Sequence, residues 1–170
     1  GQDCAGLIFA RSQSGARPAI EITWFQALAA CANVGKRLPT NAEWQMAVSG
    51  TPNNGAAEDR ATDCNTNGAI PSEPTGSRSN CVSAFGAYDM VGNVWEWVAD
   101  WVPLSAEPCP GWAGFSDDHM CLAGARTDGR GPGPLFRGGG FNDGDAAGEF
   151  SVVSLLVPQQ TGLIGFRCAR

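Results

Sequence analysis

Apart from arginine, the chain has very few basic residues. It holds one histidine, His119, and one lysine, Lys36, and seventeen acidic residues outnumber eleven basic ones, for a net charge of −6. Because no basic stripe is available to neutralise phosphates, we expect no nucleic-acid partner. A lone imidazole cannot supply a multi-histidine metal site, so His119 is interpreted as a loop residue.

Long apolar runs are also missing. No stretch approaches the roughly 18 apolar residues of a membrane-spanning helix, so we expect no membrane insertion by this segment. The chain starts without the charged and apolar regions of a signal peptide. Its 170 residues fit one domain, 1–170, and its 23 glycines and 11 prolines favour short elements joined by many turns.

Seven cysteines are many for a chain of this length, yet no C-x-x-C pair occurs. A metal centre or a redox motif is therefore disfavoured. Cys64 and Cys81, like Cys109 and Cys121, lie in glycine- and serine-rich stretches and suit disulfides that close loops. This cysteine usage predicts an oxidising, extracytoplasmic or cell-surface location, with Cys4 as the odd cysteine.

Two helices are predicted by their start and stop signals. Thr23 and Gln26 have the spacing of a capping box, and Gly35 supplies a stop. The apolar positions that follow at helical spacing are Phe25, Leu28, Ala29 and Ala32. A second capping box, residues 40–43, opens a helix that carries Trp44, Ala47 and Val48.

The rest of the chain predicts short strands between long irregular stretches. Residues 51–84 and 103–134 have little periodicity, whereas 85–102 is strongly apolar and aromatic. The candidate strands are residues 7–10, 135–137, 149–153 and 163–169. Helices first and strands afterwards favour an α+β fold with an antiparallel sheet.

Four segments together carry a resemblance to a known family. They are Gly-Lys-Arg-Leu-Pro-Thr-Asn-Ala-Glu-Trp at 35–44, Tyr-Asp-Met-Val-Gly-Asn-Val-Trp-Glu-Trp at 88–97, Arg-Gly-Gly-Gly-Phe at 137–141 and Ile-Gly-Phe-Arg-Cys-Ala at 164–169. In this order they resemble the formylglycine-generating-enzyme/sulfatase-modifying-factor family, over about residues 18–170. The resemblance implies that family's variant of the C-type-lectin fold.

The resemblance also implies a disulfide and a metal site. The family's framework bridge corresponds here to Cys31 and Cys168. Asp89 and Glu96, with the main-chain carbonyls of Gly92 and Val94, form an all-oxygen set of the kind that binds Ca²⁺, and the family holds calcium in this segment. The alternative is that both carboxylates cap turns or pair with arginine.

The catalytic part of the family pattern is absent from the sequence. The family's enzymes carry a copper-binding cysteine pair soon after the Arg-Gly-Gly motif, and residues 141–163 contain no cysteine. Without a thiolate there is neither a soft-metal site nor a nucleophile. The related iron-dependent sulfoxide synthases need a histidine cluster, which one histidine cannot supply. We therefore expect a chain that is not an enzyme.

The segment 140–163 resembles the diversified stretch in variable proteins of diversity-generating retroelements. In those proteins the stretch begins near an Arg-Gly-Gly motif, ends near a Gly-Phe-Arg motif and is displayed on a C-type-lectin scaffold. Residues 19–27 and 41–47 also look like that subgroup. The candidate ligand-binding positions are Gly140, Asn142, Asp143, Asp145, Ala146, Ser154, Leu155, Leu156, Thr161, Gly162 and Leu163.

The leading interpretation is a non-catalytic ligand- or receptor-binding domain whose partner is an unknown protein or surface ligand. The alternatives are a diverged formylglycine-generating-enzyme-like oxidase and an accessory structural domain of a surface protein. If the first holds, the candidate positions should be exposed, while Phe141 and Phe166 should be buried. If the segment 140–163 is instead an ordinary loop between strands, its side chains should pack into the core.

Overall fold

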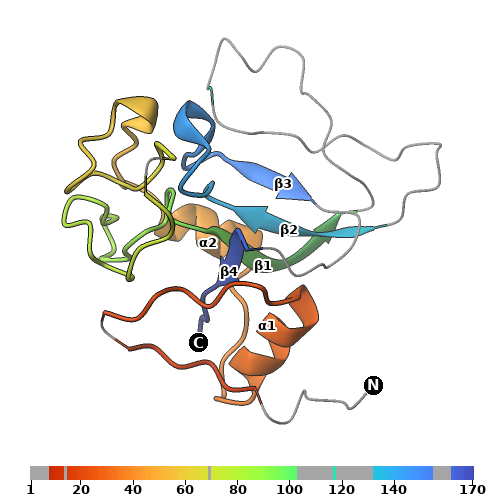
Figure 1. Cartoon of the computed structure of the whole chain (residues 1–170). Coiled ribbons are helices and arrows are strands. Elements are labelled where there is room, and N and C mark those ends of the chain that lie inside the picture. Colours follow the sequence, from red (N-terminus) through yellow and green to blue (C-terminus); the bar gives the residue numbers. More distant parts are fainter. Residues whose placement is uncertain (1–7, 14, 69, 103–116, 118–131, 155–161) are drawn as a thin grey trace.

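A computed structural model describes residues 8–13, 15–68, 70–102, 117, 132–154 and 162–170 (Figure 1). Two α-helices, two short 3₁₀ turns and a four-stranded sheet make up its regular structure. The elements in chain order are α1 (Trp24–Ala32), α2 (Asn41–Ala47), η2 (Gly55–Ala57), β1 (Trp95–Val102), β2 (Gly133–Arg137), η3 (Gly144–Ala146), β3 (Val152–Ser154) and β4 (Ile164–Phe166). Within these described residues, no helix is long and apolar enough to cross a membrane.

Both predicted capping boxes are confirmed. The Thr23 hydroxyl accepts from the Gln26 amide at 3.1 Å, while the Gln26 side chain accepts from the Thr23 amide at 2.9 Å. Thr40 and Glu43 repeat the arrangement at the start of α2, at 3.2 and 2.8 Å. These bonds satisfy amide groups that a helix start otherwise leaves without partners.

The buried face of α1 differs from the predicted one. The helix buries Trp24, Ala27, Ala30 and Cys31, whereas Phe25 is 56% exposed. A one-residue offset rotates the face of a helix by about 100°. The orientation is set by Trp24, whose Nε1 donates to the carbonyl of Val98 at 2.7 Å. In α2 the prediction holds, because Trp44 and Val48 are both fully buried.

The sheet is mixed, which corrects the expectation of antiparallel strands throughout. Its order is β3-β2-β1-β4. The pairs β1–β2 and β2–β3 are antiparallel, but β1 and β4 are parallel. After β3 the chain crosses from one edge of the sheet to the other, and β4 then enters in the direction of β1. Pairing along β1 therefore places the motifs at 88–97 and 164–169 side by side.

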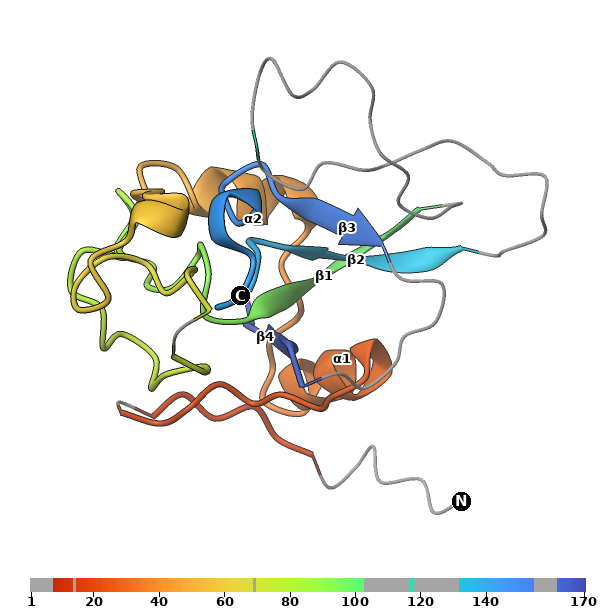
Figure 2. The ribbon, with the colours of Figure 1, turned by 45° about the horizontal axis from the view of Figure 1, so that its top comes forward.

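Two hydrophobic clusters lie on the two faces of β1. Alternate side chains of a strand point to opposite faces, and Trp97 belongs to the cluster that α1 covers while Val98 belongs to the cluster that α2 covers. Figure 2 shows the two helices on opposite sides of β1. Trp97 is fully buried, and its ring meets that of Phe136 edge-on at 5.4 Å. The tryptophans of the second motif are thus framework residues.

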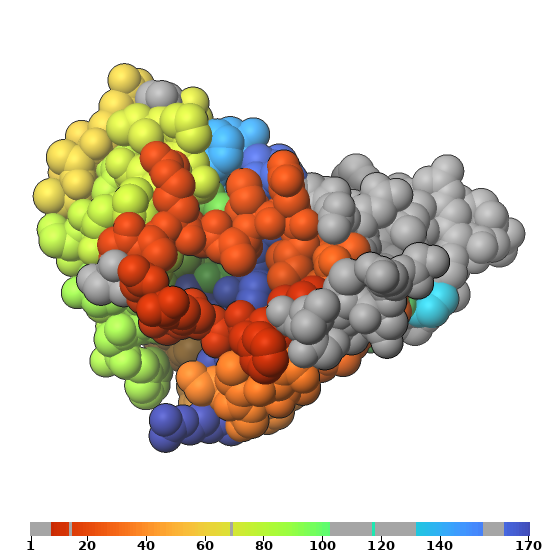
Figure 3. All heavy atoms as spheres, turned by 60° about the horizontal axis from the view of Figure 1, so that its bottom comes forward, coloured from red at the N-terminus to blue at the C-terminus, as the bar shows by residue number. Residues whose placement is uncertain are grey.

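The N-terminal segment crosses the molecule without forming the predicted strand at 7–10. Residues 8–10 have no strand structure, and Phe9 is 61% exposed. The Ala10 amide bonds to Ala30 of α1 at 2.9 Å, and further along the carbonyl of Ala16 accepts from Thr75 at 3.0 Å. Figure 3 shows this red segment lying across the face that also presents the C-terminal residues.

Two of the three expected disulfides are present. Cys31–Cys168 joins α1 to the C-terminal motif across 137 residues, and Cys64–Cys81 closes a 17-residue separation within the long loop. Cys64 and Cys81 are buried in the cluster beneath α2. The predicted Cys109–Cys121 bridge and Cys4 lie outside the described residues.

Candidate ligand-binding segment and the framework beneath it

One side chain from each of the four sequence motifs enters a single polar network. Nε1 of Trp44 donates to Oε2 of Glu96 at 2.7 Å, and Nε of Arg167 donates to the same oxygen at 2.6 Å. Nη2 of Arg167 pairs with Oε1 of Glu96. The guanidinium of Arg137 lies 4.8 Å from the centre of the Trp44 ring. The four motifs, far apart in the sequence, therefore meet at one largely buried site.

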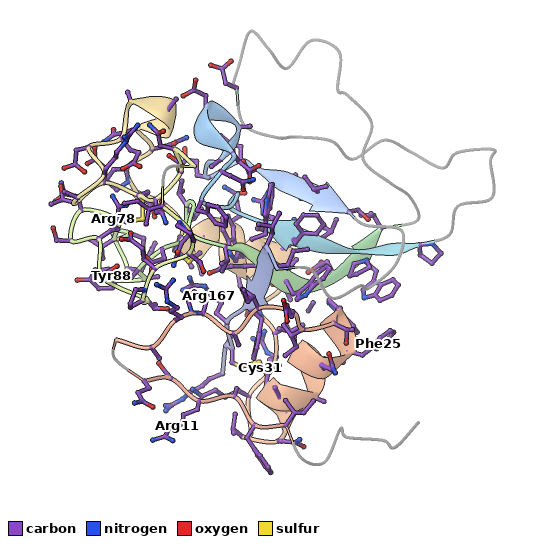
Figure 4. The ribbon with its side chains drawn as sticks, in the orientation of Figure 1. Arg11, Phe25, Cys31, Arg78, Tyr88 and Arg167 are labelled. Atoms are coloured by element: carbon purple, nitrogen blue, oxygen red, sulfur yellow. A yellow bond between two sulfur atoms is a disulfide. The ribbon has the colours of Figure 1, made fainter. Side chains whose placement is uncertain are left out.

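Arg167 also contacts the turn that precedes β1. Its Nη2 donates to the carbonyl of Tyr88 at 3.0 Å, and Figure 4 shows the two residues next to each other. Burial alone would lower the pKa of Arg167, but the charge of Glu96 raises it above its ordinary value. The guanidinium therefore stays charged in the folded protein.

Asp89 occupies the left-handed backbone region in the same turn. Its φ is +56°, a conformation that aspartate, like asparagine, adopts more readily than other residues besides glycine. Its Oδ2 accepts from the Gly76 amide at 2.7 Å. Burial raises the pKa of Asp89, whereas the bond from Gly76 and the charge of Arg167 act to lower it.

The predicted calcium ligands do not fit a metal site that uses Glu96. Both carboxylate oxygens of Glu96 bond to Arg167, and one also accepts from Trp44. Gly92 and Val94 are buried in the turn before β1. Glu96 therefore pairs with an arginine, and Asp89 caps a turn, as the alternative to a calcium site predicts. Calcium binding itself stays a prediction.

The start of the 140–163 segment is held by its main chain. The Phe141 amide donates to the carbonyl of Asn93 at 3.1 Å, and the Phe141 carbonyl accepts from the Gly68 amide at 2.5 Å. The Gly144 amide donates to the carbonyl of Thr66 at 2.7 Å. Figure 1 shows η3, in blue, beside η2, in yellow. The course of the chain at Phe141 and Gly144 is therefore held by bonds that do not involve their side chains.

The candidate binding positions divide into three groups. The exposed ones are Asn142, Asp145, Gly162 and Leu163, and the half-buried ones are Asp143 and Ala146. The buried ones are Gly140 and Ser154. Leu155, Leu156 and Thr161 lie outside the described residues, so the expected exposure of the leucine pair is not tested.

Gly140 and Ser154 are corrections to the predicted surface. A Cβ added to Gly140 would lie 3.3 Å from Cδ1 of Trp95, because the glycine packs directly on that ring. Ser154 pairs with Leu135 in the sheet and is only 4% exposed. Neither residue can contact a ligand without rearrangement of the core beneath it.

The two aspartates of the segment have partners within the protein. Oδ2 of Asp143 accepts from the Gly140 amide at 2.7 Å. Oδ1 of Asp145 accepts from the Ala56 amide at 2.7 Å and so joins η3 to η2. Their carboxylates help to shape the segment as well as line its surface.

Glu149 and Phe150 were not among the predicted positions. Glu149 is half-buried and Phe150 is 36% exposed, and their carbonyls accept hydrogen bonds from the buried guanidinium of Arg137. Nothing in the local sequence distinguishes them, because their exposure depends on a residue twelve or more positions earlier. Phe141 and Phe166, which were expected to be buried, are both half-buried.

Two helices, a small mixed sheet and long loops define a C-type-lectin fold, on which η3 of the 140–163 segment lies beside η2. The chain belongs to the sulfatase-modifying factor enzyme 1-like domain family, whose model matches residues 6–170. The family includes enzymes. The chain is 36% identical over 101 residues to the formylglycine-generating enzyme of Thermomonospora curvata, a match that covers 49% of this chain and 33% of that enzyme.

Solved structures with the same fold include proteins that are not named as enzymes. The chain is similar to Treponema denticola variable protein 1, with a TM-score of 0.59, 20% identity and coverage of 88% of this chain and 69% of that one. It is also similar to the Major Tropism Determinant M1 variant, with a TM-score of 0.58, 19% identity and coverage of 86% and 36%. At these identities the likeness establishes the fold alone.

Proposed function

We propose that this chain is a non-catalytic ligand- or receptor-binding domain, the variable protein of a diversity-generating retroelement, and that it binds through the 140–163 segment. The observation that carries the proposal is the way the segment is held. Main-chain bonds fix Phe141 and Gly144, while the side chains of Asn142 and Leu163 are exposed. A surface that changes its side chains without changing its path needs this arrangement.

The absence of cysteine from residues 141–163 supports a role without catalysis. The family's copper chemistry requires thiolate ligands, and a soft metal has no alternative donor of that kind in this stretch. Cys168 is not available either, because it is bonded to Cys31. The two disulfides also support an oxidising location outside the cytoplasm.

Repeated sequencing of the coding region in cultured cells tests the proposal directly. We expect substitutions at adenines within codons 140–163, a nearby reverse transcriptase gene and a second copy of the region that serves as the template. Codons 88–97 provide the internal control and should stay constant. A uniform 140–163 region without a template copy would contradict the diversification.

A turnover assay separates the proposal from the oxidase alternative. The purified domain is incubated with copper and a sulfatase-type cysteine peptide, and aldehyde formation is followed by mass spectrometry. We expect no product from this chain, with the Thermomonospora curvata enzyme as the positive control. Conversion of the peptide would favour the diverged enzyme.

A further inference from the structure

Arg137 binds three consecutive main-chain carbonyls of the 140–163 segment. It is the last residue of β2 and is only 3% exposed. Nη1 donates to the carbonyls of Phe150 at 3.2 Å and Ser151 at 3.1 Å, and Nη2 donates to that of Glu149 at 3.4 Å. One buried cation therefore defines the course of a three-residue turn.

The framework holds this guanidinium in place. Its central carbon lies 4.8 Å from the centre of the Trp44 ring, within the range of a cation–π contact. Trp44 is fully buried and is itself hydrogen-bonded to Glu96. Because a guanidinium is a planar fork of donors, fixing its plane also fixes the directions in which it can donate.

Neighbouring positions in the turn are restricted by packing. A Cβ added to Gly139 would lie 2.4 Å from Cβ of Ala147, so the two backbones approach too closely for a larger residue. The Gly148 amide bonds to the carbonyl of Gly138 at 3.1 Å, and the Gly138 amide bonds to that of Ser151 at 3.2 Å. Between these fixed points, Glu149 and Phe150 bond to Arg137 through carbonyl groups that any residue possesses.

We propose that Arg137 is a positioning residue that sets the 149–151 turn through its main chain, and that Glu149 and Phe150 are thereby ligand-contacting positions of the segment. This assignment rests on the proposed binding function and extends its surface beyond the predicted positions. Phe150 gives the segment a large apolar side chain that is 36% exposed. Partly exposed aromatic side chains often anchor protein partners, so the ligand class that fits is a protein surface.

Amide hydrogen exchange of the isolated protein tests the positioning role. In Arg137→Met, and to a smaller extent in Arg137→Lys, we expect the Gly148 and Ser151 amides to exchange at least about tenfold faster, because hydrogen bonds from a charged donor are lost. Val98→Ala is the matched control, since it truncates a fully buried apolar side chain of the cluster beneath α2 and removes no hydrogen bond to residues 149–151. It should change the two amides no more than those of α1.

Side-chain truncation completes the experiment. Glu149→Ala and Phe150→Ala should leave exchange at Gly148 and Ser151 within about threefold of the wild type, since their carbonyls remain. Amide exchange in the Arg137 variants could instead rise equally in α1 and in the turn. Arg137 would then have only a general stabilising role, and the proposal would be overturned. Strongly accelerated exchange in Glu149→Ala would overturn it as well. These outcomes need no ligand, so they are independent of the sequencing test of the binding function.

Discussion

The guanidinium of Arg167 and the carboxylate of Glu96 form a two-point ion pair, with Nε 2.6 Å from Oε2 and Nη2 against Oε1. The pair spans the only parallel contact in the described sheet, between β1 and β4. It therefore fixes the C-terminal motif against the central strand. The same carboxylate accepts from Trp44 and so ties α2 to both strands.

We expect Glu96→Gln to lower the free energy of unfolding by about 3 kcal/mol. The substitution leaves Arg167 largely buried beside a neutral partner, and the 29% exposure of its side chain places the effect at the lower end of the range for broken buried pairs. Denaturant unfolding measures it. Glu43→Gln is the control, because the Arg37–Glu43 pair is exposed and glutamine also suits a capping box. A Glu96 variant as stable as this control would contradict the assigned role.

Calcium chelation separates the predicted calcium site, under which the melting temperature should fall, from the Arg167–Glu96 pair alone, under which it should stay unchanged. A cation bound only by the folded form would stabilise it by mass action, but the oxygens of Glu96 already bond to Arg167 and Trp44. The measurement compares thermal melts with excess chelator and with millimolar calcium. A melting temperature that rises with calcium would confirm the predicted metal site and would require Arg167 to release Glu96.

Asp89→Asn should raise the melting temperature at neutral pH. Burial raises the pKa of Asp89 in the folded state, so the ionised carboxylate opposes folding above that pKa and the penalty disappears as the pH falls toward its unfolded value. Asparagine removes the charge, can still accept from Gly76 and tolerates the positive φ of this position. The advantage of the variant should shrink as the pH is lowered toward about 4. A variant less stable than the wild type at neutral pH would contradict this expectation, because it would show that the charge of Asp89 stabilises the fold.

Local signals predicted the parts of the fold that depend on neighbouring residues. Both capping boxes follow from Thr and Gln or Glu at fixed spacing, whereas the Cys31–Cys168 bridge was implied by the resemblance to the family. The inward face of α1 could not be predicted in this way, since Trp24 and Phe25 are both apolar. The choice between them depends on Val98, 74 positions away from Trp24.

The candidate site also depends on contacts between residues far apart in the sequence, which local patterns do not predict. The sequence places Asp89 and Glu96 within one turn and strand, which suits calcium and an arginine pair equally well. Only the parallel entry of β4 brings Arg167 to Glu96. Ser154 was predicted to be exposed because it lies in the segment that resembles a diversified stretch, but it pairs with Leu135 in the sheet and is buried. Exposure within the 140–163 segment is thus decided by strand pairing rather than by composition.

The last prediction separates the displayed positions of the segment from its buried ones. Asn142→Ala should change the free energy of unfolding by no more than about 0.5 kcal/mol, because its side chain is exposed, and Leu163→Ser should cost about 1 kcal/mol, because Leu163 is 37% exposed. Ile164→Ala, one position further, should cost about 2–5 kcal/mol, since Ile164 is 2% exposed and packs with Trp95 and Trp97.

Ser154→Ala should have the opposite sign. Within the part of the chain that the structure describes, the buried Ser154 hydroxyl has no hydrogen-bond partner, so its removal should stabilise the protein by about 1 kcal/mol. Denaturant unfolding of the four single variants gives the comparison. Large losses in both Asn142→Ala and Leu163→Ser would mean that these side chains belong to the core. The segment would then be a loop that the fold requires, and a surface open to diversification would need to lie elsewhere on the domain.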